Sequence, residues 1–405
     1  MRVVLTSLPI YSHVVPALIP LAKALRRHGH EVAVATGDAM ADELRQAGIR
    51  WLRLPGVINH AELSADRELI ERLKLVPHPA SLIGKRPLSR EEDDHAFREV
   101  FVGVLAERFA DGVVTQARAW GVDLVVSESL EFGGCLAAEK LGVPHAVLDT
   151  APLMRIHHPE LPEWLDILRE KVGLGPAGDL TRHGGRLRAG LLPELWYPEQ
   201  LREPACRHYR PDEEADDKSR IDQWLADLPG DQPLVLMTLG TGAPDNMPKD
   251  APLFEILVEA LGAVRCVAIV ALGRYRDPSQ WSGPRPDNVH LVRFVPQRKL
   301  LTTCSAFVTH AGFSGVREAL LGGVPMLTIP LFGEQAENSA RVAELGLGMA
   351  LNLANLDAAS VADAVSALLE HPVYRNAALS MRRKILGLPG FDQLVADLAA
   401  LTEHA

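Results

Sequence analysis

The 405-residue sequence has few cysteines, and the four lie far apart in the chain. They are Cys135, Cys206, Cys266 and Cys304. This spacing argues against a disulfide framework or a zinc site and favours a reducing, cytoplasmic environment. Long apolar runs are also absent, because none approaches the ~18 residues of a membrane-spanning helix. The chain begins directly with the strand-like RVVLTSL instead of a basic and then apolar signal peptide, so we expect no targeting segment.

Positive charge is scarce as well. Lysine and arginine together number 42, against 52 aspartates and glutamates, which gives a net charge of −10. This balance argues against nucleic acid and against an anionic membrane as the main partner. The composition is otherwise that of a globular chain, 47% hydrophobic and 23% charged, and the length suits two or three domains. A homodimer is expected only because dimers are the commonest assembly.

Two parts of the sequence alternate between short β-branched runs and helical spacing of apolar residues. In residues 1–205 the predicted strands are RVVLTSL, EVAVAT, IRWLRL, DLVVSE and HAVLDT, and in residues 226–385 they are PLVLMTL, CVAIVAL, NVHLVRF, AFVTH and VPMLTIP. This alternation predicts an α/β fold with two Rossmann-like, doubly wound parallel sheets that face a cleft. The charge run PDEEADDKSR (211–220) indicates a linker over 206–225, and residues 386–405 are predicted as an amphipathic C-terminal helix.

A histidine and a carboxylate follow two predicted strands of the first half. His13 comes soon after the first strand, where the G-x-G-x-x-G fingerprint of a dinucleotide site is absent. Glu128 closes the fourth strand, which neighbours the first in the usual strand order, so it could accept the N–H of His13 and orient it as a general base. The alternatives are a histidine that only completes a turn and a glutamate that only caps a helix. No G-x-S-x-G elbow supplies a nucleophile, so we expect the hydroxyl that loses its proton to belong to a substrate.

The second half contains two small-residue turns that each follow a predicted strand. One holds His310, Gly312, Ser314 and Gly315 before a helix, and backbone N–H groups at a helix start attract anions such as a diphosphate. The other, Gly240–Gly242, could close over the same anion. Farther along, Glu334 and Gln335 follow a strand end, where such side chains either bind a hydroxyl-rich ligand or simply begin a helix.

Taken together, these motifs resemble glycosyltransferase family 1, nucleotide-sugar-dependent enzymes with the GT-B fold, and most closely the actinobacterial enzymes that glycosylate antibiotics. The family pattern W-x-P-Q, H-x-G-x-x-S/T-x-x-E, G-V-P and P-x-x-x-D/E-Q corresponds to FVPQ (294–297), HAGFSGVRE (310–318), GVP (323–325) and PLFGEQ (330–335). The N-terminal pattern G-H-x-x-P corresponds to SHVVP (12–16). The resemblance covers nearly the whole chain. It implies an acceptor-binding domain over 1–205, a donor-binding domain over 226–385 and a terminal helix that crosses back to the first domain.

The resemblance also implies a role for each matching residue. His13 matches the general base and Glu128 the acid that orients it. The donor site it implies comprises a base platform with its neighbours (Phe294, Val295, Gln297), a diphosphate cradle (Thr241, His310, Gly312, Ser314, Gly315), a ribose contact (Glu318) and a pair for the sugar hydroxyls (Glu334, Gln335).

Three residues depart from the family pattern. Ser12 replaces the usual glycine, Glu128 replaces an aspartate, and Gly315 stands where a serine or threonine is usual. The implied reaction is an inverting sugar transfer in which the diphosphate leaves as the acceptor oxygen attacks. No D-x-D motif occurs, so we expect no metal and no other cofactor beyond the nucleotide-sugar co-substrate, with dTDP favoured over UDP.

The acceptor is expected to be a hydrophobic small molecule. The segments 55–95 and 151–205 lack clear periodicity and are predicted as long binding loops. Their candidate contacts are Leu63, Leu82, Met154, Trp164, Trp196 and Tyr197, although apolar residues there can equally pack the loops onto the domain. Two other functions stay open: a nucleotide-sugar epimerase, which needs no acceptor, and a catalytically silent relative that activates a partner enzyme.

Overall fold

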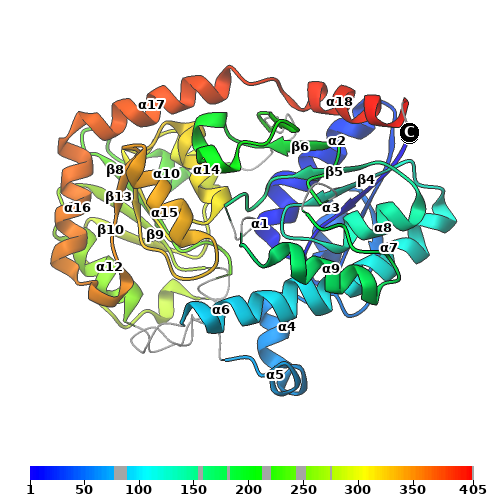
Figure 1. The fold of residues 1–405 in the computed structure, drawn as a ribbon. Coiled ribbons are helices and arrows are strands. Elements are labelled where there is room, and N and C mark those ends of the chain that lie inside the picture. The colour runs from blue at the N-terminus through cyan, green and yellow to red at the C-terminus, as the bar shows by residue number, and fades with distance from the viewer. Residues whose placement is uncertain are drawn as a thin grey trace. The chain divides into compact units, whose positions relative to one another are not determined.

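The computed structural model describes residues 1–76, 89–153, 158–179, 183–211, 220–242, 252–273 and 276–403 (Figure 1). The chain divides into two compact units. The first comprises Met1–Pro77, Leu88–Glu214 and Leu388–Ala405, and the second comprises His78–Pro87 and Ala215–Gly387. Each unit is built on one parallel sheet covered by helices, so the predicted α/β class with two doubly wound sheets is confirmed.

The sheet of the first unit has seven strands in the order β3-β2-β1-β4-β5-β6-β7, and every described pair is parallel. The strands are β1 (Arg2–Thr6), β2 (Glu31–Thr36), β3 (Arg50–Arg53), β4 (Leu124–Glu128), β5 (His145–Leu148), β6 (Leu187–Gly190) and β7 (Cys206–His208). β1 pairs with both β2 and β4. The chain order therefore changes direction between β1 and β4, and in such sheets ligands bind beyond the carboxyl ends of the strands at this point.

The described residues of the first unit include several helices, some packed on the sheet and others on neighbouring helices. They are α1 (Tyr11–His13), α2 (Ile19–Arg27), α3 (Ala41–Gln46), α4 (His60–Ala65), α5 (Arg67–Leu73), α6 (Arg90–Ala96), α7 (Ala106–Trp120), α8 (Gly133–Leu141), α9 (Leu161–Lys171) and α18 (Phe391–Glu403). Two π-helical segments (Val14–Leu18, Phe97–Leu105) and three 3-10 turns (Asp38–Met40, Glu194–Trp196, Glu199–Leu201) complete the set.

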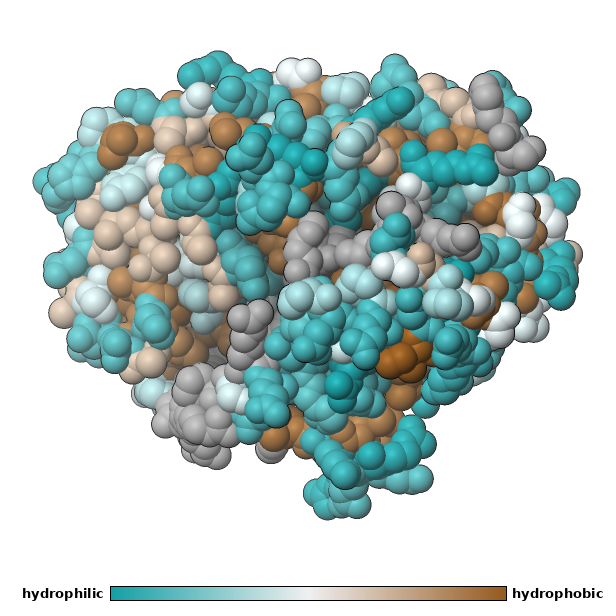
Figure 2. Space-filling model, viewed as in Figure 1, coloured by the Kyte–Doolittle hydropathy of each residue, from teal (hydrophilic) through white to brown (hydrophobic). Residues whose placement is uncertain are grey.

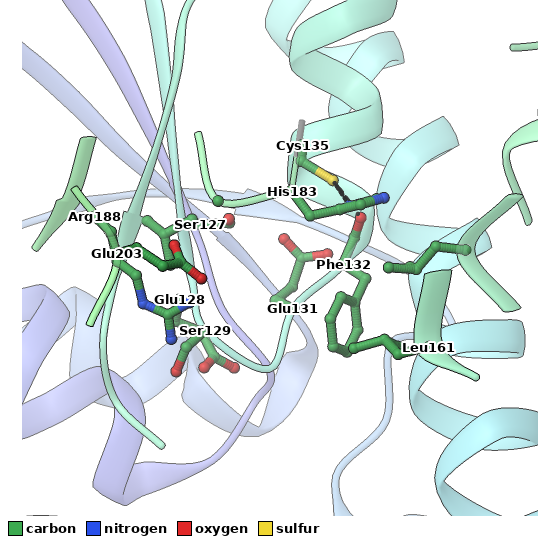
Figure 3. A pocket seen from close by; sticks show the side chains of 13 residues that line it. Ser127, Glu128, Ser129, Glu131, Phe132, Cys135, Leu161, His183, Arg188 and Glu203 are labelled. Atoms are coloured by element: carbon green, nitrogen blue, oxygen red, sulfur yellow. Dashed lines mark hydrogen bonds between the residues drawn. The ribbon is translucent and has the colours of Figure 1, made fainter. Parts of the chain in front are cut away.

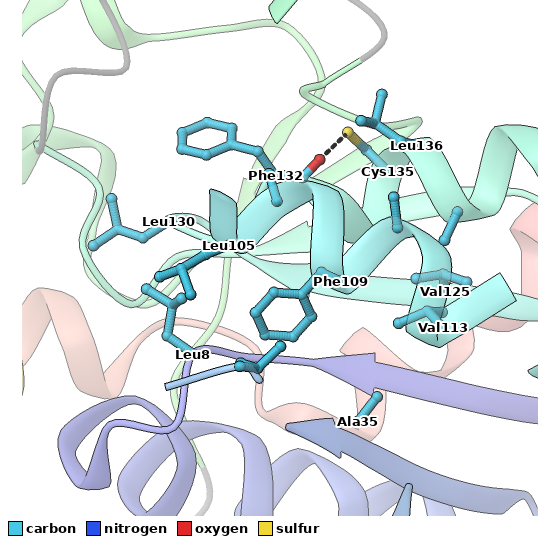
Figure 4. Close-up of a cluster of buried hydrophobic side chains, with 14 of the residues drawn as sticks. Leu8, Ala35, Leu105, Phe109, Val113, Val125, Leu130, Phe132, Cys135 and Leu136 are labelled. Carbon is cyan, nitrogen blue, oxygen red and sulfur yellow. Dashed lines mark hydrogen bonds between the residues drawn. The ribbon is translucent and has the colours of Figure 1, made fainter. Parts of the chain in front are cut away.

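The core of this unit lies between the sheet and helices α7 and α8 (Figure 4). Phe109 and Leu136 are fully buried there. The two helices approach closely because position 133 is glycine: a Cβ at Gly133 would overlap the carbonyl of Ala106 and come within 2.5 Å of the Phe109 side chain. This close packing fixes the start of α8 directly beyond the end of β4.

The first unit differs from the sequence prediction in its two irregular segments. Residues 151–205 contain α9 and β6, and β7 carries the sheet three residues into the range 206–225 that was predicted as linker. Trp164, Trp196 and Tyr197 are buried, at 6%, 0% and 2% exposure, so these side chains pack the segment onto the unit and do not form an open acceptor surface. Of the other candidates, Leu63 is partly buried and packs against the hydrophobic core of this unit, and Leu82 and Met154 lie outside the described residues.

The sheet of the second unit has six parallel strands in the order β10-β9-β8-β11-β12-β13. They are β8 (Leu234–Thr238), β9 (Val267–Ala271), β10 (Val289–Val292), β11 (Ala306–Thr309), β12 (Met326–Thr328) and β13 (Gly348–Ala350). The predicted strands are all present, and only β13 was not foreseen. The chain order changes direction between β8 and β11, which places a second ligand position beyond their carboxyl ends.

Helices of the second unit follow the strands in turn. They are α10 (Gln223–Ala226), α12 (Leu253–Gly262), α13 (Gln297–Leu301), α14 (Phe313–Gly322), α15 (Gln335–Glu344), α16 (Ala358–Glu370) and α17 (Pro372–Leu386), with 3-10 turns at Pro278–Gln280 and Leu353–Asn355. Because α14 starts four residues after β11 ends, the intervening turn lies at the switch point of this sheet.

The C-terminal helix α18 belongs to the first unit. Asp392 accepts hydrogen bonds from His28 at 2.9 Å and Arg27 at 3.2 Å, both at the end of α2. Asp397 accepts one from the Tyr209 hydroxyl at 2.5 Å, just after β7. The last helix is therefore attached to the sheet that contains the first strand of the chain.

Apolar side chains on the surface are scattered. Figure 2 shows one face on which separate apolar patches alternate with hydrophilic residues. The large apolar side chains most exposed in the described ranges are Ile167, Leu195, Trp224, Phe294, Val373 and Leu386. Within those ranges no single helix is long and apolar enough to cross a membrane, and only α17 and α18 taken together across a bend reach that length and composition.

Candidate active site

His13 is placed by an irregular helix start. The chain leaves β1 at Thr6, turns at Ile10 and forms the single turn α1, followed by the π-helical residues Val14–Leu18. Pro20 has no N–H to donate to the carbonyl of residue 16, so a regular α-helical hydrogen bond is impossible there. Wider π turns of this kind are frequent at functional sites. In this irregular helix start His13 is largely buried, with 8% of its surface exposed.

His13 and Glu128 lie in contact. The His13 Nδ1 atom is 3.2 Å from Oε1 of Glu128, whose side chain is fully buried. The pairing of β1 with β4 brings the two strand ends together, as the strand order expected from the sequence requires. A proton on Nδ1 then donates to the carboxylate and leaves Nε2 of the same ring to accept another proton.

The Glu128 carboxylate is surrounded by further donors. Its Oε2 accepts hydrogen bonds from the Thr150 hydroxyl at 2.5 Å and the Leu130 N–H at 2.9 Å, and its Oε1 lies 3.5 Å from the Leu8 N–H. Burial alone would raise the pKa of Glu128, but the charge of His13 and these hydrogen bonds hold it below its ordinary value. Glu128 is therefore an ionised acceptor at neutral pH.

A small cavity lies beside Glu128 inside the first unit (Figure 3). Glu131 lies within it, accepting hydrogen bonds from the Thr6 hydroxyl and from the N–H groups of Gly133 and Gly134 at the start of α8. Burial nevertheless raises the pKa of Glu131 to about 8, and the neighbouring charge of Glu128 adds to that rise. Glu131 is therefore largely protonated at neutral pH, next to a second carboxyl that is ionised.

The cavity also holds a cysteine beside a histidine. The Cys135 sulfur is 2.9 Å from Nδ1 of His183. Burial raises the pKa of the Cys135 thiol and lowers that of His183 to about 4, so both groups are neutral. A neutral thiol is a poor nucleophile, so this pair does not form a reactive thiolate–imidazolium dyad.

In the second unit, the turn between β11 and α14 has a strained backbone. Ala311 has a φ of +65°, a left-handed conformation that is unfavourable for alanine. Its N–H donates to the Thr309 hydroxyl at 3.3 Å, and its carbonyl accepts from the side chain of the fully buried Asn338 at 3.0 Å. Side chains from two neighbouring elements therefore hold the shape of this turn at the start of the helix.

His310 brings the two predicted small-residue turns together. A Cβ at Gly240 would lie 2.7 Å from its ring, and a Cβ at Gly312 would lie 2.6 Å from its Nε2, so only glycine fits at either position. Thr241 follows Gly240 directly, in the turn after β8. Burial lowers the pKa of His310 to about 4, although a hydrogen bond with the Thr238 backbone opposes that shift. The ring is a neutral spacer and hydrogen-bonding group between the turns.

Gln297 and Glu318 form a hydrogen bond next to these turns. Nε2 of Gln297 donates to Glu318 at 2.8 Å, and burial raises the pKa of Glu318 while Arg317 and Gln297 oppose the rise. Gly315 lies beside them, since a Cβ there would be 3.7 Å from Nε2 of Gln297. Ser314 occupies the second position of α14. Phe294 is 54% exposed, whereas the adjacent Val295 is buried.

Glu334 and Gln335 hold the loop that follows β12. Gln335 is 5% exposed, and its side-chain oxygen accepts from the N–H groups of Leu331 and Phe332 at 2.8 and 3.1 Å. Oε1 of Glu334 accepts from the Phe313 N–H at 3.3 Å, which ties this loop to the start of α14. Both residues thus have a structural function in addition to any contact with a ligand.

Comparison with known proteins identifies the family and the fold of this chain. Residues 228–385 match the family described as UDP-glucoronosyl and UDP-glucosyl transferase, and residues 23–154 match the erythromycin biosynthesis protein CIII-like N-terminal domain. Tylactone mycaminosyltransferase of Streptomyces fradiae is 31% identical over 99% of this chain and 92% of its own length. The chain belongs to this glycosyltransferase family. Its fold is that of the glycosyltransferase SnogD from Streptomyces nogalater, with a TM-score of 0.74, 25% identity and 99% of each chain covered.

A second solved relative has the same GT-B fold. The glycosyltransferase VinC, crystallised in complex with dTDP, matches with a TM-score of 0.76 at 23% identity over 100% of each chain. Among the residues that the structure describes in this glycosyltransferase, no group of three or more His, Cys, Asp or Glu could hold a metal ion.

Sequence reasoning missed two side chains of this glycosyltransferase that contact the candidate site. Thr150 donates to Glu128, and Asn338 holds the carbonyl of Ala311. Thr150 could have been found, because it ends the predicted strand HAVLDT next to the strand of Glu128. No sequence pattern marks Asn338 as a site residue, since it lies within a helix and reaches the turn only through the tertiary packing of α15.

Proposed function

We propose that this glycosyltransferase moves a sugar, favouring a deoxysugar, from a dTDP- or UDP-sugar to a hydroxyl of a hydrophobic natural-product acceptor, with inversion and without a metal. The observation that carries the proposal is the contact between His13 and the buried, ionised Glu128. A histidine whose Nδ1 proton is held by a carboxylate can accept a proton at its Nε2 and so act as a general base.

The proposed reaction is a single displacement. Nε2 of His13 takes the acceptor O–H proton while the oxygen forms a bond to the anomeric carbon of the sugar. The bond from that carbon to the diphosphate oxygen breaks, and the nucleoside diphosphate leaves with the electron pair. Attack opposite the leaving group inverts the configuration, and Glu128 stabilises the imidazolium that forms.

The second unit supplies what a leaving diphosphate needs. The N-terminus of α14 follows the turn built by His310, Ala311 and Gly312, and its backbone N–H groups and helix dipole favour negative charge. Thr241 follows Gly240, which lies against the His310 ring. Phe294 offers an exposed ring for the nucleobase, Glu318 a carboxyl for the ribose, and Glu334 with Gln335 polar groups for the sugar. These roles extend the family resemblance to residues that follow β8, β10, β11 and β12 or lie in α14, all in the second unit.

The relatives support the choice of substrates. The matched proteins include an aclacinomycin-T 2-deoxy-L-fucose transferase of Streptomyces galilaeus and a 3-alpha-mycarosylerythronolide B desosaminyl transferase of Saccharopolyspora erythraea, whose names give a 2-deoxy-L-fucose or desosaminyl group as the one transferred. The VinC structure contains dTDP. Metal independence is proposed because the chain has no D-x-D motif and the expected diphosphate contacts come from helix N–H groups.

The test is nucleotide release by wild type and His13→Gln, with dTDP-glucose or UDP-glucose as donor, tylactone or aklavinone as acceptor, and EDTA present. We expect release to depend on the acceptor and His13→Gln to lower kcat by about 10²–10⁴. Calorimetric binding of dTDP by His13→Gln should be unchanged, and the exposed His371→Gln serves as control.

Equal turnover in wild type and His13→Gln would remove His13 from the mechanism. Release that does not need the acceptor would favour an epimerase or hydrolase, and loss of activity on adding EDTA would contradict metal independence.

A further inference from the structure

Thr150 lies at the centre of the site without being part of the motifs that define it. It is 2% exposed and follows the end of β5, the strand next to β4. Its hydroxyl oxygen is 2.5 Å from Oε2 of Glu128 and 3.5 Å from Nδ1 of His13. Thr150 thus contacts both members of the proposed acid–base pair.

The direction of the hydrogen bond follows from the chemistry of the partners. An ionised carboxylate only accepts, so the single hydroxyl proton of Thr150 goes to Oε2 of Glu128. His13 donates to the other oxygen, Oε1. With the Leu130 N–H also on Oε2, the carboxylate group is fixed at both oxygens and its plane cannot turn away from the imidazole.

Thr150 is itself held in place. The Ser129 hydroxyl oxygen accepts from the N–H groups of Thr150 at 3.1 Å and Ala151 at 3.0 Å, and the Ser129 N–H donates to the Leu148 carbonyl at 3.0 Å. These bonds lock the carboxyl ends of β4 and β5 together. Because these bonds hold Thr150 in place, its hydrogen bond also holds the side chain of Glu128 in one orientation.

We propose that Thr150 is a positioning residue for the base, acting on His13 through Glu128. The inference rests on the proposed function. A glutamate has one more torsion to fix than an aspartate, and fixing a rotamer costs free energy. The Thr150 hydroxyl removes that freedom by binding the oxygen that His13 does not use.

The test compares Thr150→Val, which keeps the shape and removes the hydroxyl, with Thr150→Ser, which restores it. We expect Thr150→Val to lower kcat about tenfold to a hundredfold, with unchanged KM for the dTDP-sugar, because one hydrogen bond to a charged group is lost. Thr150→Ser should recover most of the activity. In a Glu128→Gln background the Val substitution should add little, since its target is already removed.

A second readout needs no substrate. In protein with isotope-labelled histidine, the Nδ1 proton of His13, assigned by its absence in His13→Gln, reports the hydrogen bond to Glu128. We expect it to shift or broaden in Thr150→Val and to return in Thr150→Ser. Thr6→Val is the matched control, because Thr6 is equally buried but donates to Glu131 instead of Glu128. If Thr150→Val does not fold, Thr150→Cys, a weak donor of similar size, replaces it.

The outcomes separate the two proposals. If wild type transfers sugar and Thr150→Val matches it in kcat and in the His13 signal, the inference is wrong and the proposed function stands. A raised KM at unchanged kcat would also overturn it, because that result indicates a binding role. If wild type transfers no sugar while dTDP binds, the proposed function fails, and the inference falls with it whatever the spectra show.

Discussion

Glu131 should make the stability of the first unit fall as the pH rises, and Glu131→Gln should abolish that dependence. Burial raises the pKa of Glu131 to about 8 in the folded chain, against an unfolded value of about 4.5. The folded state therefore keeps a proton on this group over a range in which the unfolded state has lost it. The stability that the proton provides is fully present below pH 4.5 and is lost as the pH rises to about 8.

The magnitude follows from the linkage between protons and folding. Each pH unit well inside that window removes about 1.4 kcal/mol and the slope flattens near pH 8, so the change between pH 6 and pH 9 is about 2.7 kcal/mol. A folded pKa one unit lower would halve this to about 1.4 kcal/mol. Glutamine carries no charge at either pH and can keep accepting from Gly133 and Gly134 through its amide oxygen. The advantage of Glu131→Gln over wild type should therefore grow by about that amount.

The effect is measured by urea unfolding at pH 6 and pH 9. Unfolding is monitored through the fluorescence of Trp164 and Trp196, which are buried in the same unit as Glu131. Subtracting the variant from wild type cancels groups that titrate in both. Buried His145, with its pKa lowered to about 3, stays neutral in the folded chain but titrates near 6.5 when unfolded, so it adds a slope near pH 6 that is the same in both proteins and cancels in the difference. Glu170→Gln, on the exposed side of α9, is the control and should show no pH-dependent difference. A difference between Glu131→Gln and wild type that is the same at both pH values would refute the reasoning.

Two further predictions concern the turn at the start of α14. A Cβ at Gly315 would meet Phe307, Thr309 and Gln297 only at 3.6–3.7 Å, so Gly315→Ser fits and should tighten calorimetric dTDP binding about tenfold by one added hydrogen bond to a charged group. Gly315→Ala, the control, should only stabilise the helix by up to about 1 kcal/mol, and weaker dTDP binding by the serine variant would count against the proposed cradle. Ala311→Gly should raise the free energy of unfolding by about 0.5–1 kcal/mol because φ at this residue is +65°, whereas Ala319→Gly within α14 should lower it by about 1 kcal/mol. Urea unfolding of both variants measures these changes. An equal loss of unfolding free energy in Ala311→Gly and Ala319→Gly would show that the left-handed turn is not strained.

The part of the site that depends on strand order could be predicted from the sequence. Alternating strands and helices fix a parallel sheet, and right-handed crossovers leave β1 beside β4, so His13 and Glu128 had to end close together. The same logic brought the Gly240 and His310 turns together at the ends of β8 and β11. These contacts follow from topology and do not depend on side-chain detail.

Other features could not be predicted because they depend on packing. α9 was missed although Leu161, Trp164, Leu165 and Leu168 have helical spacing, because prolines and irregular flanking sequence obscured it. β13 has only three residues, and its Gly348 is explained by the closeness of the Met326 backbone, which leaves no room for a Cβ. The hydrogen bonds of Gln335 to its own loop likewise appear only in three dimensions.

The glutamate at position 128 is best understood with its neighbours and not as an isolated departure from the family's aspartate. A longer side chain at the end of β4 could swing away from His13, and taken alone it argues for weakened catalysis. The structure shows its carboxylate hydrogen-bonded to the Leu130 N–H just ahead in the chain and to Thr150, which follows the end of the adjacent strand β5. Those two donors occupy Oε2, and Oε1 remains directed at His13. The extra methylene is thus compensated by the hydrogen bond from Thr150, so the glutamate is compatible with an active base.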